Sequence, residues 1–101
     1  MVYNKLVRDK IPEIIKNQGQ TPHIRVLEDA EYRSCLEAKL DEEVGEYHRD
    51  KNAEELADIL GVVFALAEEL GCSRQALMDT CQKKHDARGG FHDRVFLISK
   101  E

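Results

Sequence analysis

Five carboxylate residues near the middle of the chain constrain the fold most strongly, because they follow helical spacing on both sides of a short break. Glu42, Glu43 and Glu46 form an EExxE pattern, and Glu55 and Asp58 form an ExxD pattern after eight intervening residues. Only the polar stretch 48–52 breaks the two helical patterns, and a connection of this length joins neighbouring helices. The spacing therefore predicts two helices that form an antiparallel hairpin.

The first of these helices carries a carboxylate inside its apolar stripe. At about 100° of rotation per residue, Leu36 lies about 20° and Leu40 about 60° around the helix from Glu43. An unpaired carboxylate is costly to bury. We therefore expect a positively charged group to meet Glu43.

The hairpin geometry predicts which carboxylates face each other. Residues that face each other across an antiparallel hairpin have position numbers with a constant sum, which places Glu46 opposite Glu55 and Glu43 opposite Asp58. Four carboxylates on one side of a hairpin repel one another unless a divalent cation neutralises them. Ligands that are all oxygen favour Mg²⁺, with Mn²⁺ as a substitute, over zinc.

A purely structural interpretation of the same acidic residues is also open. Asn52 and Glu55 have the spacing of a helix-capping pair, which by itself would account for Glu55. Acidic residues near a helix start also complement the helix dipole.

The rest of the chain predicts one mainly α-helical domain over residues 1–101. Asp9 is expected to cap a first short helix that ends near Gly19, and the hairpin helices are expected from 28 or 29 to about 48 and from a cap at Asn52 to Gly71. Ser73 is expected to cap a last helix that ends near Arg88. The segments 23–27 (HIRVL) and 95–99 (VFLIS) have strand-like composition, and their pairing as a minor two-stranded β ribbon beside the helices is a further expectation.

The third expected helix is apolar over more than half of its circumference. Its apolar residues are Leu56, Ile59, Leu60, Val62, Val63, Phe64, Leu66, Ala67 and Leu70. A helix of this kind must be covered on most sides. We therefore expect a homodimer, or a dimer of dimers, in which two hairpins complete a four-helix bundle. The alternative is a monomer whose terminal segments wrap over this helix.

Composition restricts the class of protein further. The 101 residues have a formal net charge of −5, which argues against binding to nucleic acid. No apolar run reaches the length of a membrane span, and the N-terminus lacks the apolar core of a signal peptide. Three cysteines without the spacing of a disulfide framework fit a reducing compartment. We therefore expect a cytoplasmic protein that does not associate with membranes.

Three blocks of the sequence resemble a known family. The central EEVGE followed by EELAD is similar to the EExxE…ExxD signature of the all-α nucleoside triphosphate pyrophosphohydrolases, the MazG-like superfamily. The N-terminal YNKLVRDKIPEII and the C-terminal RGGFHDRV resemble a small branch of that superfamily described as phosphoribosyl-ATP pyrophosphohydrolase-like. The three blocks lie near both ends and at the centre of the chain.

The resemblance implies Mg²⁺-dependent hydrolysis of a nucleotide between its α and β phosphates. The metal ligands of the family correspond to Glu43, Glu46, Glu55 and Asp58, and Glu42 matches the first acidic residue of the motif. Glu42 or Glu43 is the expected catalytic proton acceptor for an attacking water molecule.

Basic residues are the candidates for binding the substrate phosphates. Arginine offers paired hydrogen bonds to phosphate and lysine a point charge, although surface bases are often merely solvated. The candidates are Lys5, Arg8, Lys10, Lys84 and Arg88. Arg8 and Arg88 are preferred because they lie within the family-like blocks.

Two other functions stay open on the sequence alone. One is the phosphoribosyl-ATP pyrophosphohydrolase reaction of histidine synthesis. The other is a non-catalytic dimeric helical module that keeps the scaffold and a structural metal. All four ligand positions carry carboxylates, which argues against the second alternative.

Overall fold

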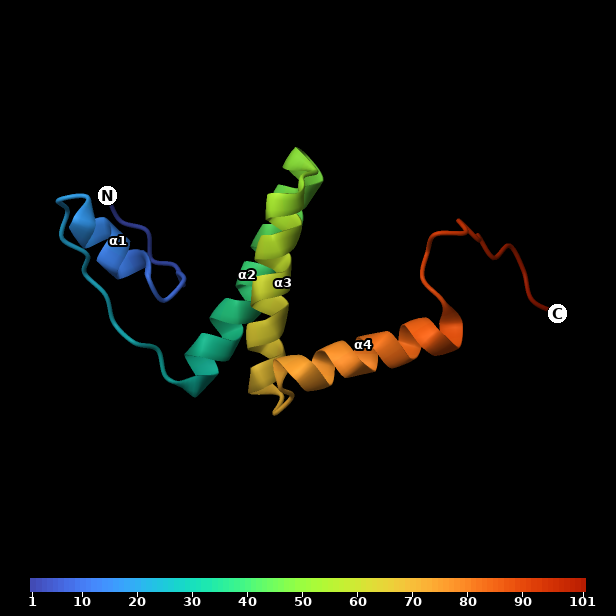
Figure 1. Ribbon diagram of the computed structural model, residues 1–101. Coiled ribbons are helices and arrows are strands. Elements are labelled where there is room, and N and C mark those ends of the chain that lie inside the picture. The colour runs from blue at the N-terminus through green and yellow to red at the C-terminus, as the bar shows by residue number, and fades with distance from the viewer.

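The computed structural model describes residues 1–101 and contains four helices and no strand (Figure 1). The helices are α1 (Ile11–Asn17), α2 (Asp29–Asp50), α3 (Ala53–Glu69) and α4 (Arg74–Arg88). The expectation of an all-α fold is confirmed. The two expected strands are wrong, because residues 23–27 and 95–99 are both irregular. A short strand needs a paired neighbour, and these segments lie on opposite sides of the molecule (Figure 1).

The starts of α3 and α4 are fixed by side-chain caps, as expected. The Asn52 side chain accepts a hydrogen bond of 3.0 Å from the Glu55 backbone N–H, and Ser73 accepts one of 3.1 Å from the Ala76 N–H. The expected cap at Asp9 is wrong, since α1 begins at Ile11 and no side chain caps it. Helix α2 ends in a left-handed residue, Lys51, so that the chain reverses within two residues.

Helices α2 and α3 lie side by side and form the only closely packed part of the chain (Figure 1). The buried apolar residues of the chain are Leu36 of α2 and Val62 and Ala67 of α3. The fourth buried residue of the chain is Glu43. The antiparallel hairpin predicted from the carboxylate spacing is therefore present, and it positions the acidic cluster described below.

Outside the hairpin the chain is open. Its accessible surface is 9263 Å², whereas a compact protein of 11.6 kDa exposes about 5,800 Å². Its radius of gyration is 17.9 Å, against about 13 Å for a compact domain of this length. Helix α4 extends away from the hairpin (Figure 1).

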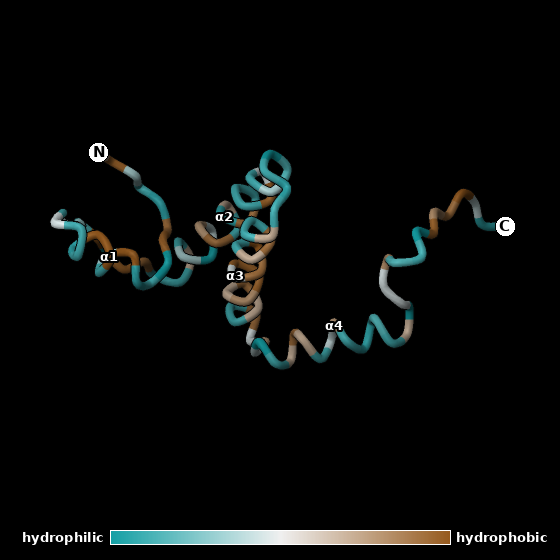
Figure 2. The backbone as a smooth tube through the Cα atoms, turned by 45° about the horizontal axis from the view of Figure 1, so that its top comes forward, coloured by the Kyte–Doolittle hydropathy of each residue, from teal (hydrophilic) through white to brown (hydrophobic).

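Much of the exposed surface is apolar. Figure 2 shows apolar backbone positions along α1, along α3 and near the C-terminus. Leu56 and Leu60 of α3 are each about half exposed, and Phe96 is almost fully exposed. One copy of the chain therefore leaves a large apolar area uncovered. No helix combines the length and apolar content that a membrane crossing requires.

Candidate metal centre

The four predicted metal ligands come together on one side of the hairpin. Glu43 and Glu46 belong to α2, and Glu55 and Asp58 belong to α3. One carboxylate oxygen from each residue lies within 4.8 Å of the corresponding oxygens of the other three. The two-residue connection between the helices sets this register, so the convergence follows from the spacing of the sequence.

Glu43 is the most deeply placed carboxylate of the cluster. Its side chain is 9% exposed, and its Oε1 lies 3.4 Å from Nζ of Lys39. Its second oxygen, Oε2, is buried without a hydrogen-bond partner, and so is Oε2 of Glu55. Buried polar atoms without a partner are rare in folded proteins because they lose their hydration without compensation. These two oxygens are free to accept a contact from a positively charged group.

The pKa of Glu43 is shifted because its buried charge is not fully compensated by its neighbours. Burial raises the pKa of the Glu43 carboxyl above its ordinary value, and the neighbouring Glu46 carboxylate raises it further. The Lys39 ammonium acts in the opposite direction but does not cancel these effects. Glu43 is therefore only partly neutralised by the residues around it.

The donor set fits a small hard cation. All four ligands are carboxylates, the chemistry that suits Mg²⁺ and Mn²⁺ rather than a sulfur- or imidazole-seeking metal. Opposite ligands of an octahedral Mg²⁺ lie about 4 Å apart. The four clustered oxygens, which lie within 4.8 Å of one another, are close enough together for one ion to contact several of them.

The N-terminal segment lies over this cluster. Arg8 donates a hydrogen bond of 3.0 Å from Nη2 to Oδ1 of Asp58, across 50 positions of sequence. A cavity of about 280 Å³ lies between the segment and the hairpin. Its lining combines three cations with two of the cluster carboxylates and consists of Lys5, Val7, Arg8, Ile11, Lys39, Glu43 and Asp58.

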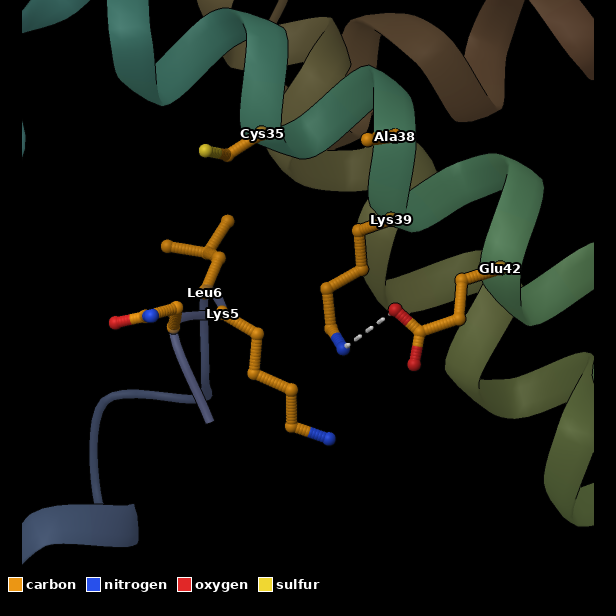
Figure 3. Close-up of a pocket in the computed structure, with 7 residues that line it drawn as sticks. Lys5, Leu6, Cys35, Ala38, Lys39 and Glu42 are labelled. Atoms are coloured by element: carbon orange, nitrogen blue, oxygen red, sulfur yellow. Dashed lines mark ion pairs between the residues drawn. The ribbon is translucent and has the colours of Figure 1, made fainter. Parts of the chain in front are cut away.

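A second cavity adjoins the first along α2 (Figure 3). It measures about 140 Å³ and is lined by Asn4, Lys5, Leu6, Cys35, Ala38, Lys39 and Glu42. Figure 3 shows the side chains of Lys5 and Lys39 entering the same space from the N-terminal segment and from α2. Lys39 Nζ lies 3.9 Å from Glu42 Oε2. Lys39 therefore contacts both adjacent glutamates of the first motif.

Lys39 is a site residue that the sequence interpretation missed. It lies four positions before Glu43 on the same helix, and a Lys–Glu pair at this spacing is a recognised helical contact. The four-residue spacing between Lys39 and Glu43 could have identified Lys39 from the sequence.

Only some of the predicted phosphate-binding residues lie near the carboxylate cluster. Arg8 and Lys5 line the larger cavity beside the cluster. Lys10 is exposed at the start of α1 and lines neither cavity. Within one chain Lys84 and Arg88 are not brought to the cluster, because α4 extends away from the hairpin (Figure 1).

The fold and the cluster define a small helical protein with a carboxylate site suited to a divalent cation. No protein-family model and no solved structure matches the chain. A protein of uncharacterised function from Mycolicibacterium smegmatis is 62% identical over 42 residues. The match covers 42% of this chain and 43% of that relative, so the chain spans less than half of the relative's length.

Proposed function

We propose that this protein is a Mg²⁺-dependent nucleotide pyrophosphohydrolase. It cleaves a nucleoside triphosphate or deoxynucleoside triphosphate between the α and β phosphates and releases a monophosphate and pyrophosphate. The observation that carries the proposal is the carboxylate cluster with the buried, unpartnered Oε2 of Glu43. The likeness of the EExxE…ExxD spacing to the MazG-like signature supplies the reaction type.

The proposed roles follow from position. Glu43, Glu46, Glu55 and Asp58 would hold the metal. Bound there, Mg²⁺ or Mn²⁺ would stabilise charge on the phosphoryl oxygens and lower the pKa of a coordinated water molecule. Glu42 lies outside the four-residue cluster and its side chain is 44% exposed. Of the two predicted catalytic glutamates, Glu42 is therefore the better proton acceptor, because Glu43 is engaged in the cluster.

The cations of the larger cavity suit a phosphate chain. Lys5, Arg8 and Lys39 converge on a space of about 280 Å³ that also contains Glu43 and Asp58. This volume is just below the range of about 300–1,000 Å³ that accommodates whole organic ligands. The cavity therefore fits the polyphosphate, while the base and sugar would extend beyond it.

The proposal includes a homodimer or a dimer of dimers. The chain exposes about 3,400 Å² beyond the surface of a compact protein of its mass. The half-exposed Leu56 and Leu60 on α3 are natural contact points for a second hairpin. Three free cysteines support a location in the reducing cytoplasm.

The test is pyrophosphate release from a panel of standard and modified NTPs and dNTPs, together with phosphoribosyl-ATP, in Mg²⁺, Mn²⁺ or EDTA. Glu46→Ala should reduce turnover by more than about 100-fold, since even indirect changes around a metal cost about 10–100-fold. Glu54→Ala is the matched control, because Glu54 is an exposed acidic residue of α3 outside the cluster.

Each alternative has its own outcome in this assay. Preference for phosphoribosyl-ATP would assign the protein to histidine synthesis. Full activity of Glu46→Ala would show that the reaction occurs elsewhere. Absence of release from every nucleotide, by folded protein that binds metal, would favour the non-catalytic helical module.

A further inference from the structure

We infer that Arg8 is an exchangeable counter-ion of the metal site: it pairs with Asp58 when no divalent cation is bound, and it contacts the substrate phosphates once a cation occupies the cluster. This inference rests on the proposed function and deepens it. It assigns a defined task to the N-terminal segment that lies over the hairpin.

The position of Arg8 is specific. Its guanidinium contacts Asp58, one of the four clustered carboxylates, at 3.0 Å. It also lines the cavity that contains Glu43 and Lys39. A divalent cation in the cluster competes for the same Asp58 oxygens, so the ion and the guanidinium oppose each other's binding there.

A glycine of α3 makes room for the guanidinium. A Cβ atom at Gly61 would lie 3.0 Å from Nη2 and 3.3 Å from Nη1 of Arg8. Gly61 has no positive φ and lies in the interior of the helix, where glycine is less favourable than alanine. The guanidinium therefore lies closer to α3 than it could if residue 61 had a side chain, unless Arg8 shifted.

The ion pair is also exposed enough to exchange. The Arg8 side chain is 64% exposed and that of Asp58 is 42% exposed. Exposed ion pairs contribute little to stability, so this one does not lock the segment in place. A guanidinium released from Asp58 stays in a cavity with Lys5 and Lys39, where it can form paired hydrogen bonds with phosphate oxygens.

The first test measures Mn²⁺ affinity by titration, with free Mn²⁺ followed by electron paramagnetic resonance and no nucleotide present. Arg8→Ala should tighten Mn²⁺ binding by about twofold to fivefold, as expected from the loss of a competing exposed ion pair. Gly61→Ala should tighten it similarly, because the new Cβ displaces the end of a flexible side chain. Arg25→Ala is the matched control, since Arg25 forms a similarly exposed pair with Glu31 at 2.8 Å near the start of α2.

The second test measures binding of inorganic pyrophosphate to the Mn²⁺-loaded protein by calorimetry. Arg8→Ala should weaken this binding by about tenfold or more, in line with the loss of a hydrogen bond to a charged group. Gly61→Ala keeps the guanidinium and should bind pyrophosphate as the wild type does. Circular dichroism checks that both variants retain their helices.

The outcomes separate this inference from the proposed function. Unchanged or weaker Mn²⁺ binding in Arg8→Ala and Gly61→Ala overturns the inference, while loss of Mn²⁺ binding in Glu46→Ala still supports the metal site. Unchanged pyrophosphate affinity in Arg8→Ala overturns the phosphate contact. Absence of Mn²⁺ binding in the wild type overturns both the inference and the proposed function.

Discussion

Substitution of Leu60 by glutamate should disrupt the proposed dimer without reaching the carboxylate cluster. Leu60 is 48% exposed in the single chain. It follows Asp58 by two positions and therefore lies about 200° around α3 from that carboxylate. A glutamate at position 60 would contact a second copy of the hairpin only if α3 forms the interface between the copies.

The expected effect follows from the exposed area. If only about half of the excess of about 3,400 Å² per chain is covered, two copies bury about 3,400 Å² in total, the size of an obligate dimer interface. Covering the exposed half of a leucine contributes about 1 kcal/mol. The substitution occurs twice in a symmetric dimer and costs about 2 kcal/mol, which corresponds to about a 30-fold rise in the dimer dissociation constant. Desolvation of the new carboxylate adds to this cost.

Sedimentation equilibrium over a range of protein concentrations measures the effect. The wild type should have twice the chain mass of 11.6 kDa, or four times that mass if dimers pair. Ser34→Glu adds the same charge at an exposed polar position of α2 and should leave the mass unchanged. A wild-type protein that sediments as a helical monomer at all concentrations would refute the reasoning from exposed area.

Three further predictions concern stability. In EDTA, Glu43→Gln should raise the melting temperature by about 4–8 °C, because removing an incompletely compensated buried charge recovers about 1 kcal/mol. The same substitution should abolish the further rise in melting temperature that Mg²⁺ is expected to produce in the wild type. Thermal scans with and without Mg²⁺ check both effects. The pKa of Glu43 is raised in the folded protein, so the stability of the fold is unaffected by this carboxyl below its ordinary pKa of 4.5 and falls as pH rises through the higher folded value. The stability advantage of Glu43→Gln in EDTA should therefore grow as pH rises above about 4.5, and an advantage that is constant with pH would contradict this account. Asn52→Ala removes the cap of α3 and should cost about 1 kcal/mol, visible as a lower melting temperature and faster hydrogen exchange at the Glu55 amide.

Local sequence patterns were sufficient to predict the hairpin and its acidic cluster. The caps at Asn52 and Ser73 and the chain reversal before α3 depend on residues within a few positions of one another. The convergence of the four carboxylates follows from helical periodicity once the connection is short. Local patterns were not sufficient for the segments 23–27 and 95–99, because a strand depends on a partner that local sequence does not supply.

Contacts between distant segments could not be predicted from the sequence. The pairing of Arg8 with Asp58 joins residues 50 positions apart, and no periodicity links the N-terminal segment to α3. Gly61 carries no signal by itself, because its role appears only when the guanidinium lies against it. Arg8 could be chosen as a candidate from the sequence, but its contact with Asp58 is evident only in the structure.

Glu43 shows how the stability of the hairpin and its chemistry are related. A leucine at this position would continue the apolar stripe of α2 beside Leu36 and would bury no charge. The chain instead keeps a carboxylate whose Oε2 has no partner and whose charge Lys39 only partly offsets. A buried carboxylate within an apolar stripe is a local inconsistency of the kind expected at functional sites, and for this reason Glu43 is central to the proposed metal site. A cation that bound only the folded hairpin would stabilise it according to its concentration relative to its dissociation constant. At the proposed metal site, the residue that weakens the metal-free protein would therefore couple folding to metal binding.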